Sequence, residues 1–280
     1  MRLKSHVLVL AVALASFALT AMTIPLQIWP TTAALSLGCG VAALSMMAVA
    51  ALLSARWQWI ESLLGGLDRV YQAHKWLAVW ALVLASFHLV FSAELDDWQT
   101  SAIIALPRAV IRLLRQLSFV ALMVIVLLAL NRRIPYSHWR WWHKLSGPLF
   151  LIAILHWLSF RSPITLGSPP GVWLAVLAGL GTLAALYRLV LYPRWSPHAR
   201  YRVATLSSSA TALHLELAPE AGRVDFEPGQ FAFLSFDEPG LRDRIRSPSW
   251  AAAAVTVRLA SSCDRWAITR PGCCAAPGPA

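Results

Sequence analysis

Long runs of apolar residues, separated by short polar and basic segments, dominate the first 192 positions of the chain. The runs fall at about 6–29, 33–54, 75–93, 116–131, 143–160 and 171–192. A helix needs roughly 20 apolar residues to cross the hydrocarbon core of a bilayer. The pattern therefore predicts six transmembrane helices, with the mixed segments 56–73 and 101–115 lying at the membrane surface.

The pattern changes from helical runs to alternation after Pro193. Residues 201–206 and 213–217 alternate apolar and polar side chains as half-buried strands do, and 230–236 follows a Pro228-Gly229 turn. We therefore expect an all-α membrane bundle of six transmembrane helices in residues 1–195. The beginning of a cytoplasmic β-barrel is expected in residues 196–244.

The composition supports a membrane protein. Hydrophobic residues make up 58% of the 280 positions and charged residues 13%, whereas a soluble protein carries about 25% charged residues. A net charge of +11 would point to nucleic acid in a soluble protein. Here the basic residues lie in short loops between apolar runs, so the expected partner is the lipid bilayer and not nucleic acid.

The distribution of lysine and arginine predicts the orientation. With the N-terminus inside, thirteen basic residues fall in the inner segments and four in the outer ones, as the positive-inside rule requires. The first apolar run is longer than the ~7–15 apolar residues of a signal peptide, so we expect an uncleaved span. The sequence thus predicts a multi-pass protein of the inner (plasma) membrane with both termini cytoplasmic.

Four histidines lie in or beside two of the apolar runs. His74 and His88 are 14 residues apart on the third predicted span, and His143 and His156 are 13 residues apart on the fifth. Because both spans run from inside to outside, equal depth pairs His74 with His143 (the inner pair) and His88 with His156 (the outer pair). A 14-residue spacing keeps two side chains on nearly one helix face, whereas a 13-residue spacing requires a distortion of the helix.

Buried histidines in a membrane span are expected to be functional. Two imidazoles at each of two depths predict two b-type haems, whose irons would be held by His74 and His143 and by His88 and His156. Zinc prefers ligands gathered at one point. The plainer interpretation makes His74 and His143 interfacial polar residues beside Lys75 and Lys144.

Phe150 lies between His143 and His156 in the sequence. We considered it as a relay between the two haems, with ordinary core packing as the alternative.

The two histidine spacings, the six predicted spans and the strands that follow resemble the ferric reductase and NADPH oxidase family over about residues 1–244. Residues 226–231, Phe-Glu-Pro-Gly-Gln-Phe, look like the strand that leads to this family's flavin site. The resemblance implies a membrane oxidoreductase in which electrons pass from NAD(P)H to FAD. They then pass to the inner haem, to the outer haem and finally to an external ferric chelate or dioxygen.

The chain departs from this family after Arg244. The family's flavin site continues with His-Pro-Phe-Ser/Thr, whereas residues 245–249 read Ile-Arg-Ser-Pro-Ser, and no glycine-rich nicotinamide motif follows. We hypothesise that residues 245–280 are an aberrant, frameshifted or disordered tail. In one shifted reading frame, the codons of residues 244–249 can encode His-Pro-Phe-Thr. In the same frame, the codons of Trp266 and Ala267 can encode Gly-Asp. A genuine divergent terminus is the alternative, and the coding DNA distinguishes the two.

Two other functions remain open at this point. The membrane part also resembles bacterial haem subunits that serve a methionine sulfoxide reductase and take electrons from a separate flavoprotein or from quinol. A transporter or structural membrane protein with incidental histidines is the other alternative.

A broken barrel would leave strand edges unpaired, so we expect the purified chain to retain no stoichiometric FAD. The flavin absorbance of the purified protein measures this directly. One bound flavin per chain would contradict it.

Overall fold

The structure is a computed structural model that describes residues 4–91, 100–131, 133–192, 199–208, 212–221 and 254–259. The chain divides into a helical unit, residues 1–134 with 138–194, and a second unit, residues 135–137 with 195–280.

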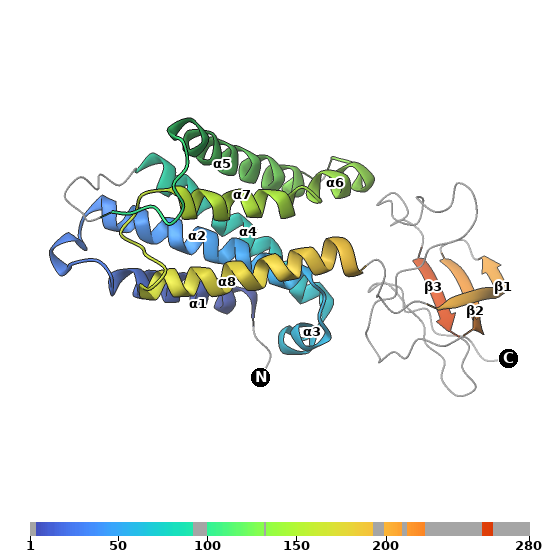
Figure 1. Cartoon of the computed structure of the whole chain (residues 1–280). Coiled ribbons are helices and arrows are strands. Elements are labelled where there is room, and N and C mark those ends of the chain that lie inside the picture. Colours follow the sequence, from blue (N-terminus) through green and yellow to red (C-terminus); the bar gives the residue numbers. More distant parts are fainter. Residues whose placement is uncertain are drawn as a thin grey trace. The chain divides into compact units, whose positions relative to one another are not determined.

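Helices make up almost all of the described part of the first unit (Figure 1). They are α1 (Ser5–Ala21), α2 (Thr32–Ser54), α3 (Gln58–Leu64), α4 (Leu67–Val90), α5 (Arg108–Leu130), α6 (Tyr136–His143), α7 (Ser146–Ser159) and α8 (Pro169–Leu186), with a 3-10 turn, η1 (Leu26–Ile28), and a π-helix, η2 (Tyr187–Leu191).

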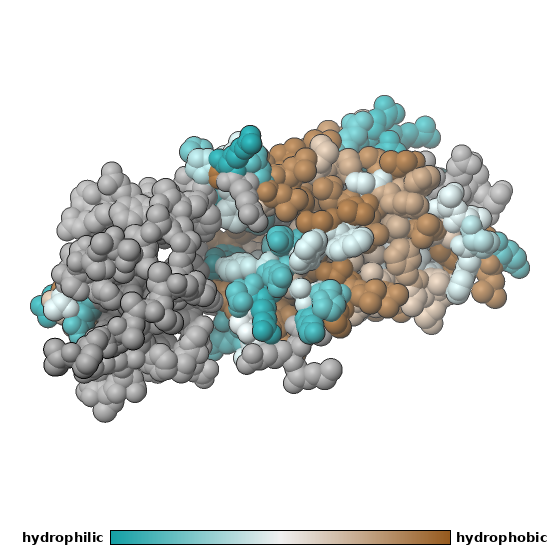
Figure 2. All heavy atoms as spheres, turned by 180° about the vertical axis from the view of Figure 1, so that it is seen from behind, coloured by the Kyte–Doolittle hydropathy of each residue, from teal (hydrophilic) through white to brown (hydrophobic). Residues whose placement is uncertain are grey.

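Four helices in the described residues are long and apolar enough to cross a membrane: Thr32–Ser54, Leu67–Val90, Arg108–Leu130 and Pro169–Leu191. The predicted number of six spans is not confirmed. The first apolar run forms the 17-residue α1, and the fifth is divided into the 8-residue α6 and the 14-residue α7. Figure 2 shows hydrophobic side chains covering much of one face of the helical unit, as lipid contact requires.

Helices α4 and α5 begin within the segments 56–73 and 101–115, whose location at the membrane surface stays a prediction. α4 begins at Leu67 and α5 at Arg108, so both segments end inside membrane-spanning helices. The first turns of α4 and α5 carry polar residues, so their sequence has the pattern of a surface segment. A membrane helix tolerates such residues at its end because charged side chains there can reach the headgroups. Only α3 remains as a separate short helix, and it ends at Gly65 and Gly66, whose positive φ angles stop the helix.

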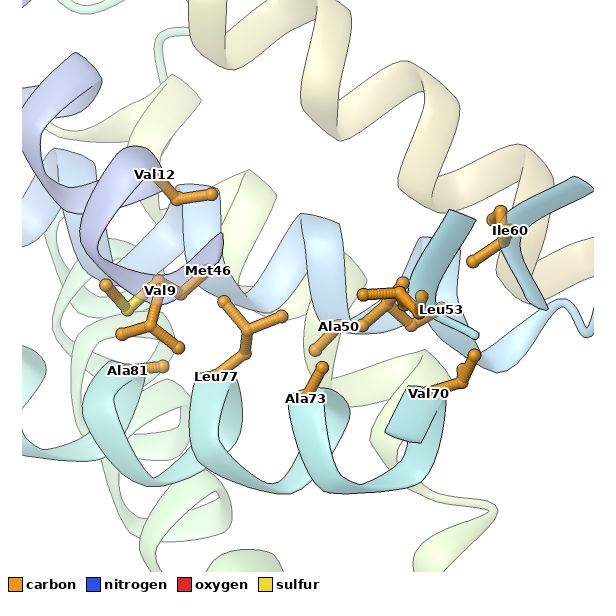
Figure 3. Packing of buried hydrophobic residues seen from close by; sticks show 11 residues of the cluster. Val9, Val12, Met46, Ala50, Leu53, Ile60, Val70, Ala73, Leu77 and Ala81 are labelled. Atoms are coloured by element: carbon orange, nitrogen blue, oxygen red, sulfur yellow. The ribbon is translucent and has the colours of Figure 1, made fainter. Parts of the chain in front are cut away.

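α2 is the centre of the bundle, since it packs on α1, α4 and α8. Its small residues allow neighbouring helices to approach closely. Figure 3 shows Met46, Ala50 and Leu53 of α2 against Ala73 and Leu77 of α4, in a cluster that α1 and α3 complete.

A buried polar contact joins three helices of the bundle. The Trp173 Nε1 of α8 donates to Ser45 Oγ of α2 at 2.9 Å and lies 3.3 Å from Ser16 Oγ of α1. Hydrogen bonds of this kind hold helices together where there is no hydrophobic driving force.

The second unit contains a three-stranded sheet in the order β1 (Arg200–Ser208), β2 (Ala212–Ala221), β3 (Ala254–Leu259). β1 and β2 are antiparallel and confirm the strands predicted at 201–206 and 213–217, while β3 pairs in parallel with β2. The strand predicted at 230–236 lies outside the described residues, and the barrel is not confirmed.

β3 lies within the stretch 245–280, which we expected to be an aberrant, frameshifted or disordered tail, and its six residues form a strand. One strand paired with β2 is not a barrel, so the proposed aberrant tail stays a prediction.

Candidate functional site: a histidine ladder on two helix lines

Two of the four predicted histidines lie on helix α4, and the other two lie on the consecutive helices α6 and α7. His74 and His88 belong to the continuous helix α4, which sets them about 21 Å apart along its axis at 1.5 Å per residue. His143 is the last residue of α6, and His156 lies in α7. In the described residues α4 packs mainly on α2, and α7 mainly on α5, so the backbones of α4 and α7 come close at few points.

The helix break between α6 and α7 supplies the distortion that the 13-residue spacing requires. Lys144 and Leu145 separate the two helices, and their amides bond back to Trp141 and Trp142, a tighter turn than that of an α-helix. Pro148 follows in the first turn of α7, where its missing N–H costs nothing. The Gly147-Pro148 pair signals this break in the sequence, yet the span predicted at 143–160 runs through it.

The inner pair comes together in the structure. The rings of His74 and His143 have centres 5.9 Å apart and planes at 73°. Two imidazoles on opposite sides of one metal ion, each bound at about 2 Å, have ring centres roughly 6 Å apart. Because both planes contain the metal axis, their mutual angle is free. The spacing of the inner pair therefore fits one iron between the two rings.

The outer pair is also matched across the two helix lines. His156 lies within electrostatic range of His88 and of Arg115 on α5. No group of three or more His, Cys, Asp or Glu side chains that could hold a metal ion occurs among the described residues. The rings of His74 and His143 meet, and His88 and His156 lie within electrostatic range of each other.

Helix α2 orients both histidines of α4. The His74 Nδ1 donates to the Ala50 carbonyl at 2.8 Å, and the His88 Nδ1 donates to the Ser36 carbonyl at 2.9 Å. A carbonyl can only accept, so Nδ1 carries the proton and Nε2 keeps its lone pair. Ala50 and Ser36 are 14 residues apart, as His74 and His88 are, and the antiparallel helices therefore repeat one contact at two depths.

Gly40 makes room for the outer of these contacts. A Cβ at this position would stand 3.1 Å from both Cε1 and Nδ1 of His88. The Ser36 hydroxyl lies 3.2 Å from the same Nδ1. Ser36 and Gly40 of α2 thus lie against the Nδ1 edge of the His88 ring, as groups beyond the metal orient ligand histidines.

The histidines of α6 and α7 lack such hydrogen bonds among the described residues. The Nδ1 atoms of His143 and His156 are buried and have no hydrogen-bond partner among the described residues. Aromatic rings flank them instead: Trp139 stacks on His143 at 4.9 Å, and Phe160 lies 5.6 Å from His156. In each pair, one imidazole is hydrogen-bonded to α2. The other has a buried Nδ1 atom without a hydrogen-bond partner among the described residues.

Comparison with known families decides the assignment of this region. Residues 39–154 match the family model described as ferric reductase like transmembrane component. The resemblance inferred from the histidines is confirmed over this segment. It contains His74, His88 and His143 and ends two residues before His156. No curated protein matches the chain.

Phe150 of the ferric reductase-like segment points into the core. The tip of its ring lies against Gly181 of α8, where a Cβ would stand 3.0 Å away. Phe150 is buried with Leu44, Ala48 and Leu177 of α2 and α8. Its role as a relay stays a prediction.

Leu149 of α7 lies in a buried cluster that α5 and α4 complete. It packs with Leu122 and Val126 of α5 and with Ala78 and Leu82 of α4. Leu149 was not predicted from the sequence, because only the position of the helix break shows which of two adjacent residues faces α4.

The inner histidine pair fits the haem that the ferric reductase-like family implies. The inner pair has the ring spacing of two ligands on one metal. Both α4 histidines present a free Nε2. The α6 and α7 histidines hold buried nitrogens that no described residue satisfies, and ligation would hold these rings in place. The family match and the four helices long and apolar enough to cross a membrane point to a membrane oxidoreductase.

Proposed function

We propose that this chain transfers electrons across a membrane through two b-type haems, one held by His74 and His143 and the other by His88 and His156. The inner pair carries the proposal, since its rings stand at the spacing of two ligands on one iron. Bound in this way, haem supplies a one-electron iron couple with no open coordination position.

The protein's part is to hold, orient and insulate these ligands. α2 fixes the tautomer of His74 and His88 through two backbone carbonyls. Leu149 and its neighbours exclude water between the two depths. Arg115 adds positive charge near the outer pair, which favours the reduced state of a site there.

The donor and the acceptor are part of the same proposal. Electrons would come from cytoplasmic NAD(P)H through FAD and leave to a ferric chelate or dioxygen on the other side. The antiparallel β1–β2 pair after the last span supports a flavin domain attached to the membrane unit. The orientation follows from the excess of basic residues in the segments assigned to the inside.

A reduced-minus-oxidised absorption spectrum of the purified full chain tests this function. We expect the bands of b-type haem and two haems per chain by haem extraction. Vesicles loaded with a reductant and surrounded by an impermeant ferric chelate should then show reduction of the chelate. Protein that is folded by circular dichroism and has no haem bands would refute the proposal.

A further inference from the structure

The hydroxyl of Ser36 leaves its own helix and meets His88. Buried hydroxyls inside a helix commonly bond back to the carbonyl one turn earlier, as those of Ser16 and Ser86 do at 2.7 Å. Ser36 is fully buried in α2 and instead donates to the carbonyl of His88 at 3.3 Å. Its oxygen also lies 3.2 Å from Nδ1 of the same histidine. One side chain therefore contacts both the backbone and the ring of His88.

These contacts determine what the Ser36 oxygen offers to the ring. The hydroxyl proton is directed to the His88 carbonyl, because a carbonyl can only accept, and the lone pairs of the hydroxyl oxygen remain for Nδ1. The Nδ1–H of His88 already donates to the Ser36 carbonyl at 2.9 Å, so the hydroxyl oxygen at 3.2 Å is a second acceptor for the same proton. Ser36 thus supplies both acceptors of one N–H group.

The inner depth repeats the carbonyl contact without the hydroxyl. Ala50 occupies the position of α2 that corresponds to Ser36, and its carbonyl accepts from Nδ1 of His74 at 2.8 Å. At the outer depth Gly40 also lets the ring lie close to α2, since a Cβ there would stand 3.1 Å from Nδ1 of His88. The two histidines of α4 therefore have the same backbone acceptor, and the hydroxyl distinguishes the outer one.

The plainer role of the Ser36 hydroxyl is to cap α4. His88 lies close to the end of this helix at Val90, and the last four carbonyls of a helix have no partner within it. A cap requires only the bond to the carbonyl. It does not account for the approach of the same oxygen to Nδ1, or for the glycine that permits this approach. The second contact acts on the ring and can be measured separately from stability.

We propose that Ser36 is a positioning residue whose hydroxyl lowers the reduction potential of the outer haem, which rests on the two-haem function proposed above. A second acceptor draws the Nδ1 proton away from the ring and makes the imidazole a more basic ligand, which favours oxidised iron. Arg115 of α5 lies within electrostatic range of His156 and acts in the opposite sense. A lower potential at the outer pair preserves reducing power at the point where electrons leave the chain.

A redox titration of the purified full chain, followed by haem absorption, tests the role with Ser36→Ala. At a fixed ambient potential we expect the ratio of reduced to oxidised haem to rise at one of the two couples. The rise should be severalfold, up to about tenfold, which is about 59 mV for a one-electron couple. The other couple should stay in place. Ser45→Ala is the matched control, since Ser45 is also fully buried in α2 but accepts from Trp173, and it should move neither couple.

Ala50→Ser is the reciprocal variant and keeps the experiment decisive if Ser36→Ala does not fold. It places a hydroxyl beside His74 in the same register, so we expect the couple that Ser36→Ala leaves in place to shift to lower potential. A hydroxyl that only caps α4 would change the unfolding temperature and leave both couples unmoved. Unmoved couples in a parent that binds haem, or an equal shift in Ser45→Ala, would overturn the role of Ser36 alone. A parent without haem would refute the proposed function as well.

Discussion

Replacing His88 by alanine is expected to remove the outer haem and leave the inner one, so that the haem content falls by about half. Transfer to an external acceptor should fall to background. Replacing His156 by alanine is expected to be milder, with part of the outer haem retained on His88 alone in a five-coordinate, high-spin form. The two ligands of one site should therefore respond unequally.

The reason lies in what holds each imidazole. α2 fixes the His88 ring through the Ser36 carbonyl and through contact with Gly40, so its Nε2 is presented to the metal before any ligand binds. The Nδ1 of His156 has no hydrogen-bond partner among the described residues, so this ring is oriented by packing alone. Losing groups that orient a ligand typically costs 10–100-fold in metal affinity, and the anchored ligand should therefore carry more of the binding.

Haem extraction and the absorption spectrum of each purified variant measure this difference. His6→Ala is the control, since His6 is exposed in α1 and outside the ladder. Equal loss of haem in His88→Ala and His156→Ala would contradict the unequal roles. Loss of both haems in His88→Ala would instead mean that the bundle requires each haem to fold.

The sequence predicted the positions of the long membrane helices well and their ends poorly. Runs of leucine, valine and alanine report burial in lipid, and all four long membrane helices coincide with them. The true start of α4 at Leu67 and of α5 at Arg108 could not be predicted from the runs. Charged residues at the end of a span have the pattern of a surface segment, although a helix can extend through them into the headgroups.

The histidines could be found from spacing, but their environment could not. Equal depth on two spans predicted the inner pair, and the rings do meet. The carbonyls of Ser36 and Ala50 that orient His88 and His74 carry no sequence signal, because every residue has a carbonyl and only the α2–α4 register selects these two. The contact of Phe150 with α8 depended in the same way on a helix break that periodicity does not show.

Replacing Gly171 by alanine is expected to have the largest effect on stability of any single methyl group added to the helical unit. A Cβ at Gly171 would stand 1.8 Å from the carbonyl oxygen of Thr165, far inside contact distance. Overpacking of a filled site costs about 1–3 kcal/mol and occasionally more. Because the clashing atom is a backbone oxygen and not a flexible side chain, the loss of stability in Gly171→Ala should lie at or above the upper end of that range.

The Thr165 carbonyl cannot move aside without further loss. It accepts hydrogen bonds from the Ser168 amide at 3.0 Å and the Ser168 hydroxyl at 2.7 Å, and the same hydroxyl caps α8 by accepting from the Gly171 amide. Ile164, the preceding residue, is buried in the core between α2, α7 and α8. Displacing the carbonyl would therefore break the cap of α8 and disturb the core that α8 shares with Phe150.

Thermal unfolding in detergent, followed by circular dichroism, tests this expectation against a control on the same helix. Outside its own stretch of helix, Gly179 has no atom within 4 Å of its Cβ position, so Gly179→Ala should be neutral or gain about 0.5–1 kcal/mol from helix propensity. We expect Gly171→Ala to unfold at a much lower temperature or to fail to accumulate. If both variants unfolded at the parent's temperature, the packing of α8 on the Thr165 turn would be wrong. The contact of Phe150 with Gly181 of α8 would then be wrong with it.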